Sequence, residues 1–373
     1  MSLKKIPWRD YMRFHVVAAF LVVLSVLVLA PVRLDGISLT SHEPIRITSN
    51  SEFTSANGVV SGAGTLDDPY IIEGWEITEA VVGVDYGIWL ENTDAYVVIR
   101  NCLIIPPYTG IRLEHVANVF IENVTVRGGH QGIYIYDSAG ITILNSDISH
   151  VVGDAIFLFS SSDVKVVNCL IGEGRYHSLY MEKIRDAKVE DCDIYGSLYG
   201  IYAEGSERVL IRNCNVHNNL GDGIYFYVVI NGTISNCQVH FNENHGIYLD
   251  SSDWITVEYC DIRNSSLGIW LNPAFNCEIH HNNFINIYSN AQDDGQQNNW
   301  DKNYWSNYHG VDANNDGYGD SPYQIPGSAN AKDNKPLMQI IPESPHIVML
   351  ALMMVALSIL MAEKINMKNK PCK

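Results

Sequence analysis

Aromatic residues recur along this sequence at a fixed spacing, with acidic residues close behind them. They occupy the third position of a short phrase, first seen as Gly87-Ile88-Trp89-Leu90, which returns every 22 or 23 residues. In nine copies that position holds Trp89, Arg112, Tyr134, Phe157, Tyr180, Tyr202, Tyr225, Tyr248 and Trp270. Two positions later stand Glu91, Glu114, Glu182, Glu204 and Asp250. Sugar rings stack their apolar faces on aromatic side chains while their hydroxyls bond to carboxylates, so the array predicts a glycan-binding face.

Two other interpretations of this array stay open. Aromatic residues are good strand formers and stack across neighbouring strands, so the array could serve only to stabilise a sheet. Exposed apolar surface also marks protein interfaces, so the partner could be a surface-layer protein instead of an envelope polysaccharide.

A second pattern has the spacing of a calcium loop. Oxygen-bearing side chains fall at positions 1, 3, 5 and 9 of a segment with glycine at position 6, and a backbone carbonyl is available at position 7. These residues are Asp312, Asn314, Asp316, Asp320 and, for the carbonyl, Tyr318. Tyr323 stands at position 12, where an EF-hand has glutamate, so a further ligand is needed and Asp333 is a candidate. The alternative is a turn cluster without metal. A bound calcium would have a structural role in a C-terminal cap.

Catalytic and copper-binding residues are harder to assign. Glycoside hydrolysis needs two carboxylates about 5 to 10 Å apart. Glu182 and Glu204 form such a pair, but any acidic repeat protein would offer one, so the catalytic residues stay unknown. His217 and His240 hold equivalent positions in adjacent repeats. Two imidazoles make a weak metal site, so copper is not expected.

The period itself indicates the fold. A second phrase, as in Ile211-Arg212-Asn213-Cys214, keeps the same spacing, and residues within each phrase alternate between apolar and polar. A period of 22 or 23 leaves no room for a helix beside the strands. Glycine and asparagine tolerate tight corners. The sequence therefore predicts an all-β, right-handed parallel β-helix of about nine to ten coils with caps at both ends.

Six cysteines share one position of the repeat: Cys102, Cys169, Cys192, Cys214, Cys237 and Cys260. Disulfides and a metal–thiolate row are possible functions, but Val124 and Ser146 fill the same position without a thiol. We therefore expect a row of small, buried, free cysteines.

The two ends of the chain are apolar. Residues 1–36 combine basic residues with an apolar run, which predicts a signal peptide or an uncleaved signal anchor. Residues 343–373 combine an apolar run with four lysines, which predicts a transmembrane helix and a basic cytoplasmic tail. The alternative for this second run is a buried terminal helix. Acidic residues outnumber basic ones by 42 to 24, a net charge of −18, which argues against nucleic acid as a partner.

The repeats resemble those of the NosD-like right-handed β-helix proteins, also described as carbohydrate-binding and sugar-hydrolase (CASH) domains. Two flanking segments, residues 61–77 and 303–323, make the resemblance closest to archaeal cell-surface members. The resemblance covers roughly residues 45–340. It implies the fold and an extracytoplasmic location. It does not imply an activity, because lyases, polygalacturonases, epimerases and phage tailspikes share such repeats.

These observations divide the chain into five parts. After residues 1–36 come an N-terminal cap and first coil (37–80), the repeats (81–295), a C-terminal cap with the calcium loop (296–342) and the terminal segment (343–373). Asn123, Asn231 and Asn264 match the glycosylation acceptor pattern and would have to lie at corners. The expected function is a membrane-anchored surface module that binds a ligand, with glycan as the candidate, or acts structurally. The alternatives are a polysaccharide lyase, hydrolase or epimerase, and an envelope accessory of a transporter or of copper maturation.

Overall fold

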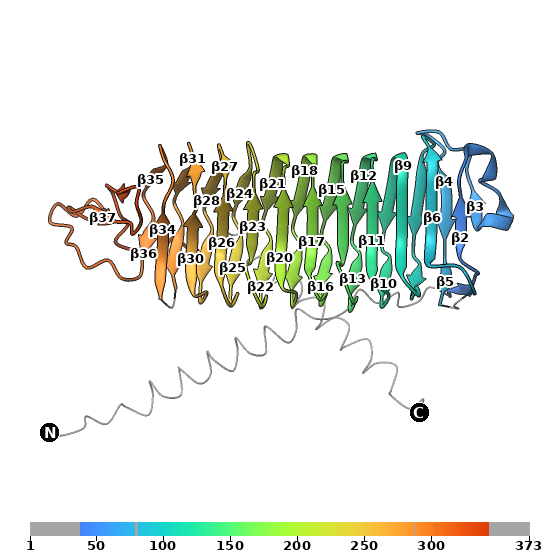
Figure 1. The fold of residues 1–373 in the computed structure, drawn as a ribbon, viewed down its shortest axis with the longest axis horizontal. Coiled ribbons are helices and arrows are strands. Elements are labelled where there is room, and N and C mark those ends of the chain that lie inside the picture. The colour runs from blue at the N-terminus through green and yellow to red at the C-terminus, as the bar shows by residue number, and fades with distance from the viewer. Residues whose placement is uncertain (1–37, 79–80, 287, 343–373) are drawn as a thin grey trace, which may run out of the picture. The chain divides into compact units, whose positions relative to one another are not determined.

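The computed structural model describes residues 38–78, 81–286 and 288–342, which lie in one compact unit. Its chain winds into successive coils whose strands form three parallel sheets, with β3–β4 and β37–β38 as antiparallel exceptions at the two ends (Figure 1). In Figure 1 sheet C runs along the top, sheet B along the middle and sheet A along the bottom. The predicted β-helix is therefore confirmed.

The strands of each sheet follow one another in chain order. Sheet A contains β1 (Thr40–Ser41), β5 (Trp75–Ile77), β8 (Leu103–Ile104), β10 (Thr125–Arg127), β13 (Asp147–Ser149), β16 (Leu170–Gly172), β19 (Asp193–Tyr195), β22 (Asn215–His217), β25 (Gln238–His240), β29 (Asp261–Arg263), β33 (Asn283–Ile285) and β36 (Tyr304–Trp305). Sheet B contains β2 (Ile45–Ile47), β6 (Tyr86–Thr93), β9 (Thr109–Glu122), β11 (Gln131–Tyr136), β14 (Ile156–Phe159), β17 (His177–Glu182), β20 (Tyr199–Glu204), β23 (Ile224–Tyr227), β26 (His245–Asp250), β30 (Leu267–Leu271) and β34 (Ser289–Asp293).

Sheet C shares the long strand β9 with sheet B, because β9 continues around the corner. It contains β3 (Val59–Ser61), β4 (Tyr70–Glu73), β7 (Val97–Arg100), β12 (Ala139–Leu144), β15 (Ser162–Val167), β18 (Arg185–Glu190), β21 (Glu207–Arg212), β24 (Thr233–Ser235), β28 (Thr256–Glu258), β32 (Glu278–His280), β35 (Asn299–Asp301), β37 (Tyr323–Gln324) and β38 (Lys332–Asp333). The short strands β27 (Ser252–Asp253) and β31 (Ala274–Phe275) pair in parallel with each other on the sheet C side.

The core lies inside the coils, where every second side chain of each strand points. Ile201, Ile211 and Val216 come from the three sheets of one coil, and all are fully buried. The cysteine position also faces inward. Each of the six predicted thiols is buried and free, and each donates to the carbonyl two residues earlier, as Cys214 Sγ does to Arg212 O at 3.3 Å. Among the described cysteines the row is thus one of small apolar groups, as predicted.

The glycines of the repeated phrase have a different role from the predicted one. They lie within sheet B without positive φ, and they are buried where sheet A turns into sheet B. A β-carbon at Gly110 would come within 2.3 Å of Val126 Cγ1 and 2.4 Å of Gly132 O. Glycine is needed there because two backbones and a core side chain approach closely. Ala155 and Ser178 are the small residues that replace it in two coils.

Asparagine does form the corners between sheets C and A. Asn101, Asn123, Asn145 and Asn168 all adopt positive φ, which asparagine tolerates. Their side chains are joined from coil to coil, with Asn123 Nδ2 donating to Asn101 Oδ1 at 2.5 Å and Asn168 Nδ2 to Asn145 Oδ1 at 2.7 Å. The corner thus holds successive coils in register.

The expected fold class was wrong in including long apolar helices. Within residues 38–342, apart from the gaps at 79–80 and 287, no helix is long and apolar enough to cross a membrane. The only helices there are the 3₁₀ turns η1 (Asn50–Glu52) and η2 (Ser55–Asn57). A coil of three strands and their corners uses the whole period, so the repeats have no residues left for a helix. The two apolar segments on which the expectation rested lie outside the described residues.

A buried carboxylate closes the C-terminal end. Asn282 and Asn303 continue the cysteine position in the last coils, and Asp333 follows them from β38. Asp333 is fully buried and accepts from the backbone N–H groups of Lys302, Asn303 and Lys335 and from Trp305 Nε1. It terminates the row by satisfying donors of the last coil, so its oxygen atoms already have protein partners there.

This arrangement predicts local unfolding when Asp333 is removed. Asp333→Ala leaves several buried N–H groups without acceptors, at about 1–3 kcal/mol each. Because each coil contacts only its neighbours, we expect faster amide hydrogen exchange in β35, β36 and β38 and unchanged exchange in the coils of β6 and β9. The exposed Asp67→Ala is the control. Unchanged exchange in β35 and β36 of Asp333→Ala would contradict this role.

Candidate functional site

The predicted aromatic positions form one continuous row on the outer face of sheet B. Every residue pairs in register with its equivalent in the next coil, as Tyr202 does with Tyr180 and Tyr225. From Tyr134 to Trp270, successive ring centroids are 4.6 to 5.4 Å apart. We call this row the aromatic ladder: Tyr134, Phe157, Tyr180, Tyr202, Tyr225, Tyr248 and Trp270. All seven side chains are partly exposed.

Carboxylates beside the aromatic ladder hold its rings in place. Tyr180 donates its hydroxyl to Glu182 and Glu204, at 3.2 Å to each. Tyr225 donates to Asp250 at 3.2 Å, and Trp270 Nε1 donates to Asp294 at 3.0 Å. Burial and the neighbouring Glu182 and Glu204 raise the pKa of Tyr180, so its hydroxyl stays protonated and keeps donating. The rings are therefore anchored before any ligand arrives.

Two Asp–His pairs lie along the other edge of the aromatic ladder. His245 Nδ1 is 2.7 Å from Asp222 Oδ1, and His177 Nδ1 is 2.7 Å from Asp154 Oδ1. An ionised carboxylate only accepts hydrogen bonds, so in both pairs the histidine Nδ1 donates to the aspartate. His245 packs against Tyr248 and Trp270, with centroids 5.0 and 5.3 Å apart.

The sequence pointed to one of these pairs but not to the other. Asp222 and His245 each stand directly before the glycine of a copy of the repeated phrase, in adjacent coils, so the spacing alone makes this pair visible. Asp154 and His177 precede the same phrase in its two degenerate copies, which begin with Ala155 and Ser178 instead of glycine. Aligning all copies on the isoleucine or leucine that follows would have found them.

The N-terminal end of the same face is cationic. Trp89 lies between two guanidinium groups, with Arg46 Cζ 4.2 Å and Arg112 Cζ 4.3 Å from its ring centroid. Arg112 also pairs with Glu114 at 2.9 Å. Arg112, the one exception to the aromatic pattern, thus takes part in a cation–π stack that continues the row. The coils that carry Tyr202 to Trp270 have carboxylates beside their rings, so the two ends of this face differ in charge.

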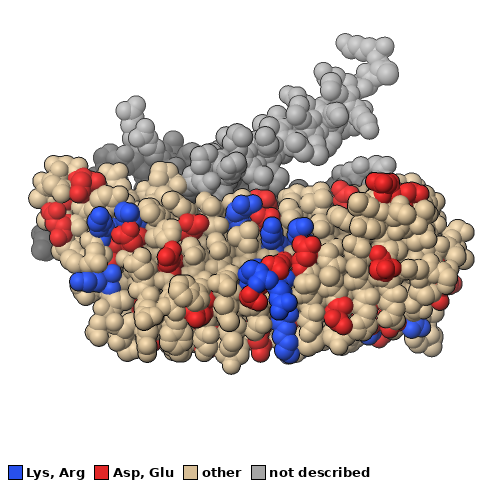
Figure 2. All heavy atoms as spheres, turned by 90° about the horizontal axis from the view of Figure 1, so that it is seen from above, with Lys and Arg blue, Asp and Glu red and all other residues tan. Residues whose placement is uncertain are grey.

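Sheet C has a mixed charged surface. Arg208 makes two bonds to Asp186, at 2.6 and 2.9 Å, and Arg212 pairs with Glu190. Figure 2, which views the molecule from the sheet C side, shows Lys and Arg side chains near the middle of this face beside Asp and Glu. Exposed pairs of this kind contribute little stability and leave no uncompensated charge for a ligand.

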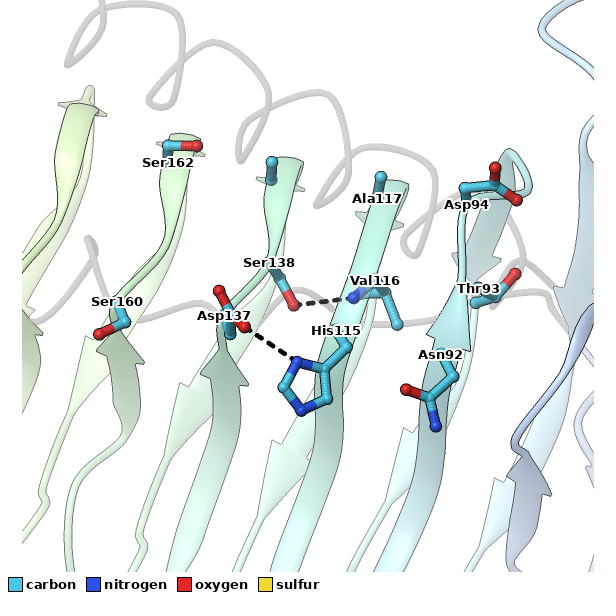
Figure 3. Close-up of a pocket in the computed structure, with 11 residues that line it drawn as sticks. Asn92, Thr93, Asp94, His115, Val116, Ala117, Asp137, Ser138, Ser160 and Ser162 are labelled. Carbon is cyan, nitrogen blue, oxygen red and sulfur yellow. Dashed lines mark hydrogen bonds and ion pairs between the residues drawn. The ribbon is translucent and has the colours of Figure 1, made fainter.

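A polar groove of about 500 Å³ follows the corner between sheets B and C (Figure 3). It is lined by residues of consecutive coils, among them Asn92, Asp94, His115, Asp137 and Ser162. His115 Nδ1 lies 3.0 Å from Asp137 Oδ2, and both side chains are well exposed. No aromatic ring other than His115 lines the groove, so it offers no stacking surface for a sugar.

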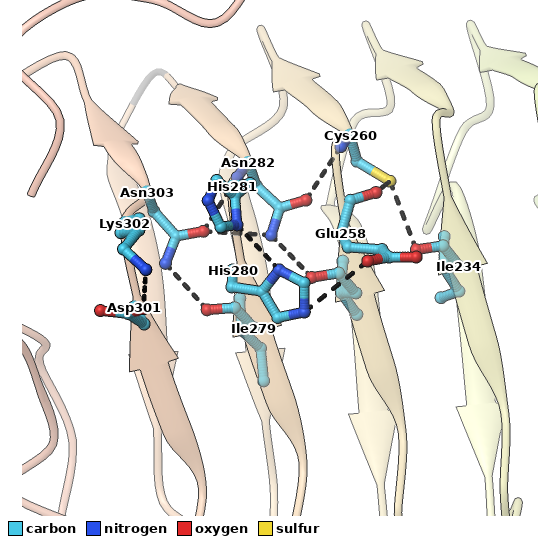
Figure 4. A network of polar contacts seen from close by, with 11 residues as sticks. Ile234, Glu258, Cys260, Ile279, His280, His281, Asn282, Asp301, Lys302 and Asn303 are labelled. Carbon is cyan, nitrogen blue, oxygen red and sulfur yellow. Dashed lines mark hydrogen bonds and ion pairs between the residues drawn. The ribbon is translucent and has the colours of Figure 1, made fainter.

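His217 and His240 are neighbours on sheet A, as their spacing indicated. Their rings stack with centroids 5.3 Å apart, and each Nε2 is bound, to Asp193 and Asn215 respectively, at 2.9 Å. His280 is the last residue of β32 in sheet C, and His281 follows it at the corner. Their Nδ1 atoms lie 3.0 Å apart (Figure 4). Across residues 38–342, gaps excepted, no three His, Cys, Asp or Glu side chains are grouped to hold a metal ion.

The calcium loop and the glycosylation sites remain predictions. Asp312 and Asp316 accept from backbone N–H groups of their own loop, as Asp312 does from Gly317 N at 2.9 Å. These bonds fold the loop into a tight turn, in which the Asp320 carboxylate also accepts from Ala313 N. The three glycosylation candidates are Asn123, Asn231 and Asn264, and all have the positive φ of corner residues. Asn231 is exposed, whereas the amide of Asn123 bonds to Asn101.

The family model of the right-handed beta helix region matches residues 70–183 and 177–317, more than half of the chain. This chain belongs to the right-handed beta helix family. The sequence of this β-helix protein matches none of the curated proteins.

Solved structures show the same fold at low identity. The mannuronan C-5 epimerase AlgE6 A-module of Azotobacter vinelandii superposes with a TM-score of 0.50 and 14% identity, covering 81% of this chain and 89% of that one. Tailspike protein 2 of the Escherichia coli O157:H7 bacteriophage CAB120 gives 0.50 and 12%, covering 81% and 43%. Pectate lyase Pel9A gives 0.44 and 14%, covering 69% and 79%. At such identities the two likenesses with a TM-score of 0.50 establish the fold and not the activity.

The histidine pair predicts a specific pH dependence of stability. Burial, with help from His217 and Arg263, lowers the pKa of His240 from its usual 6.5 to about 4. Between these values the unfolded chain binds a proton that the folded protein does not, so the free energy of unfolding falls as the pH falls, by about 3 kcal/mol at most. Urea unfolding of wild type and His240→Gln should show a smaller acid loss in the variant. The exposed His309→Gln should keep the full loss, and equal losses in all three proteins would contradict the assignment.

Proposed function

We propose that this β-helix protein binds a carbohydrate chain along sheet B. The observation that carries the proposal is the aromatic ladder, whose seven rings follow one another through successive coils. Exposed rings spaced by the strand separation of about 4.8 Å offer stacking surface along the whole length of an extended polymer.

The surroundings of the ladder support carbohydrate as the ligand. Glu204 and Asp250 are half-buried acceptors at its edge, and His177 and His245 offer nitrogen atoms on the other side. Hydroxyl groups of a sugar can donate to all of these groups. The rings are already held by hydrogen bonds such as that of Tyr225 to Asp250, so little side-chain entropy is lost on binding.

The proposal also concerns where the protein works. The features that suggest a surface location are the NosD-like flanking segments and the acceptor patterns at exposed corners such as Asn231. We infer an extracytoplasmic protein that meets envelope polysaccharide.

Removing two adjacent rings tests the proposal. In the full-length protein, Tyr202→Ala/Tyr225→Ala removes two stacking surfaces, each worth about 1 kcal/mol or more, so binding to an oligosaccharide panel should weaken at least about tenfold. Titration calorimetry measures this. Tyr288→Ala, which removes a ring that is 85% exposed, and Phe120→Ala, which removes one on sheet C, are the matched controls. Equal binding by the double variant and the controls would exclude the aromatic ladder as the binding surface.

A second candidate function is acid–base chemistry on the bound chain. The observation that favours it is the Asp222–His245 pair, in which a nearly buried carboxylate fixes an imidazole whose ring packs against Tyr248 and Trp270 of the ladder. An imidazole held in this way can accept a proton from a sugar carbon or hydroxyl. The polysaccharide-active neighbours share the fold, which is compatible with this candidate.

The catalytic candidate predicts loss of turnover without loss of binding. Polysaccharides bound by the wild type would be incubated with it and analysed by chromatography and NMR for cleaved or epimerised products. His245→Gln should reduce product formation by at least about 100-fold, the usual share of one general base, with binding retained. His217→Gln on sheet A is the control. If His245→Gln formed product as fast as the wild type, the assignment of His245 as the general base would be wrong.

A further inference from the structure

The charge along the aromatic ladder restricts which carbohydrate it can take. The strands that carry Tyr202, Tyr225, Tyr248 and Trp270 contain no lysine or arginine. The same coils place Glu204, Asp222 and Asp250 next to the rings, and Glu182 stands one coil before them. Asp222 is buried beneath His245, so a ligand on these coils meets the partly exposed carboxylates of Glu204 and Asp250 on one edge of the row of rings.

Two of these carboxylates lack a cationic partner. Glu204 accepts only from tyrosine hydroxyls, those of Tyr180 at 3.2 Å and Tyr202 at 3.5 Å. Asp250 accepts from Tyr225 and from Ser251. In the described part of the chain neither forms an ion pair, whereas on sheet C acidic residues such as Asp186 and Glu190 are paired with arginine. Half-buried carboxylates that remain uncompensated attract a cation.

We infer that the ligand of these coils is a glycan that bears free amino groups. This inference rests on the proposed function, since it names the class of carbohydrate that the aromatic ladder takes. An ammonium group on a sugar would lie against the carboxylates of Glu204 or Asp250, and it would gain further attraction from the faces of Tyr202 and Tyr225. The carboxylates lie two coils apart, with Tyr227 between them in the same row, so a polymer with repeated amines would meet both.

The same geometry disfavours uronic acids. A polyuronate would bring its own carboxylates beside Glu204 and Asp250, and like charges at this distance repel. The one cationic stretch of sheet B, Arg46 and Arg112 around Trp89, lies at the other end, and Arg112 is already paired with Glu114. The substrate class thus differs from that of the epimerase and the pectate lyase whose fold this protein shares.

Three oligosaccharides of equal length test the inference on the full-length protein. These are an oligomer of glucosamine, its fully N-acetylated form and an oligogalacturonate, each titrated by calorimetry in the same low-salt buffer. The glucosamine oligomer should bind at least about tenfold more tightly than its N-acetylated form, and the oligogalacturonate should bind most weakly. Added salt should reduce the affinity for the glucosamine oligomer alone.

A charge-removing variant separates the inference from the proposal on which it rests. Glu204→Gln/Asp250→Asn keeps the shape and an amide oxygen that can accept from the tyrosines, so the affinities for the glucosamine oligomer and for its N-acetylated form should become equal to within about twofold. Glu278→Gln, at an exposed site on sheet C, should change neither. Oligogalacturonate binding as tightly as the glucosamine oligomer would overturn the inference and leave carbohydrate binding standing. No binding of any of the three oligomers would overturn both.

Discussion

The parallel stacking of coils in exact register of their repeat positions is the constraint on which the rest of the structure depends. In the central coils each paired strand residue meets the residue 22 or 23 positions away, so a side chain lies between its own equivalents in the neighbouring coils. A property needed at one position is therefore needed in every coil. Small residues fill the tight approach at Gly110 and Gly132, asparagine fills the corner at Asn123, and small buried groups fill the cysteine position.

The same constraint produces the outer surface. Stacked equivalents make the aromatic ladder continuous, and they make each change in residue type a change in surface chemistry along the coils. Sheet B passes from the cationic stack around Trp89, through the apolar pair Tyr134 and Phe157, to the tyrosines beside Glu204 and Asp250. One face can thus present different chemistry to different stretches of a single polymer.

Much of this could be predicted from the sequence because aligned copies of a repeat show which residue types recur at each position. Period, alternation and the outward position of Tyr202 or Tyr225 follow from aligning the copies. Features that depend on contacts between unlike positions could not be predicted. Asp333 is 30 residues from Asn303, and nothing in its surroundings indicates that it closes the core. The true role of Gly110 depends on Val126, which lies in another sheet of the same coil. The Asp154–His177 pair was missed because its copies of the phrase lack glycine.

The central claim is that the aromatic ladder of sheet B is the surface that binds a sugar chain. Its most direct test is a crystal structure of the full-length protein with an oligosaccharide that it binds in solution. The account predicts sugar rings stacked on Tyr202, Tyr225 and Tyr248, with the chain running from coil to coil along sheet B. A chain seated instead in the corner groove at His115 and Asp137, or on the charged face of sheet C, would contradict it.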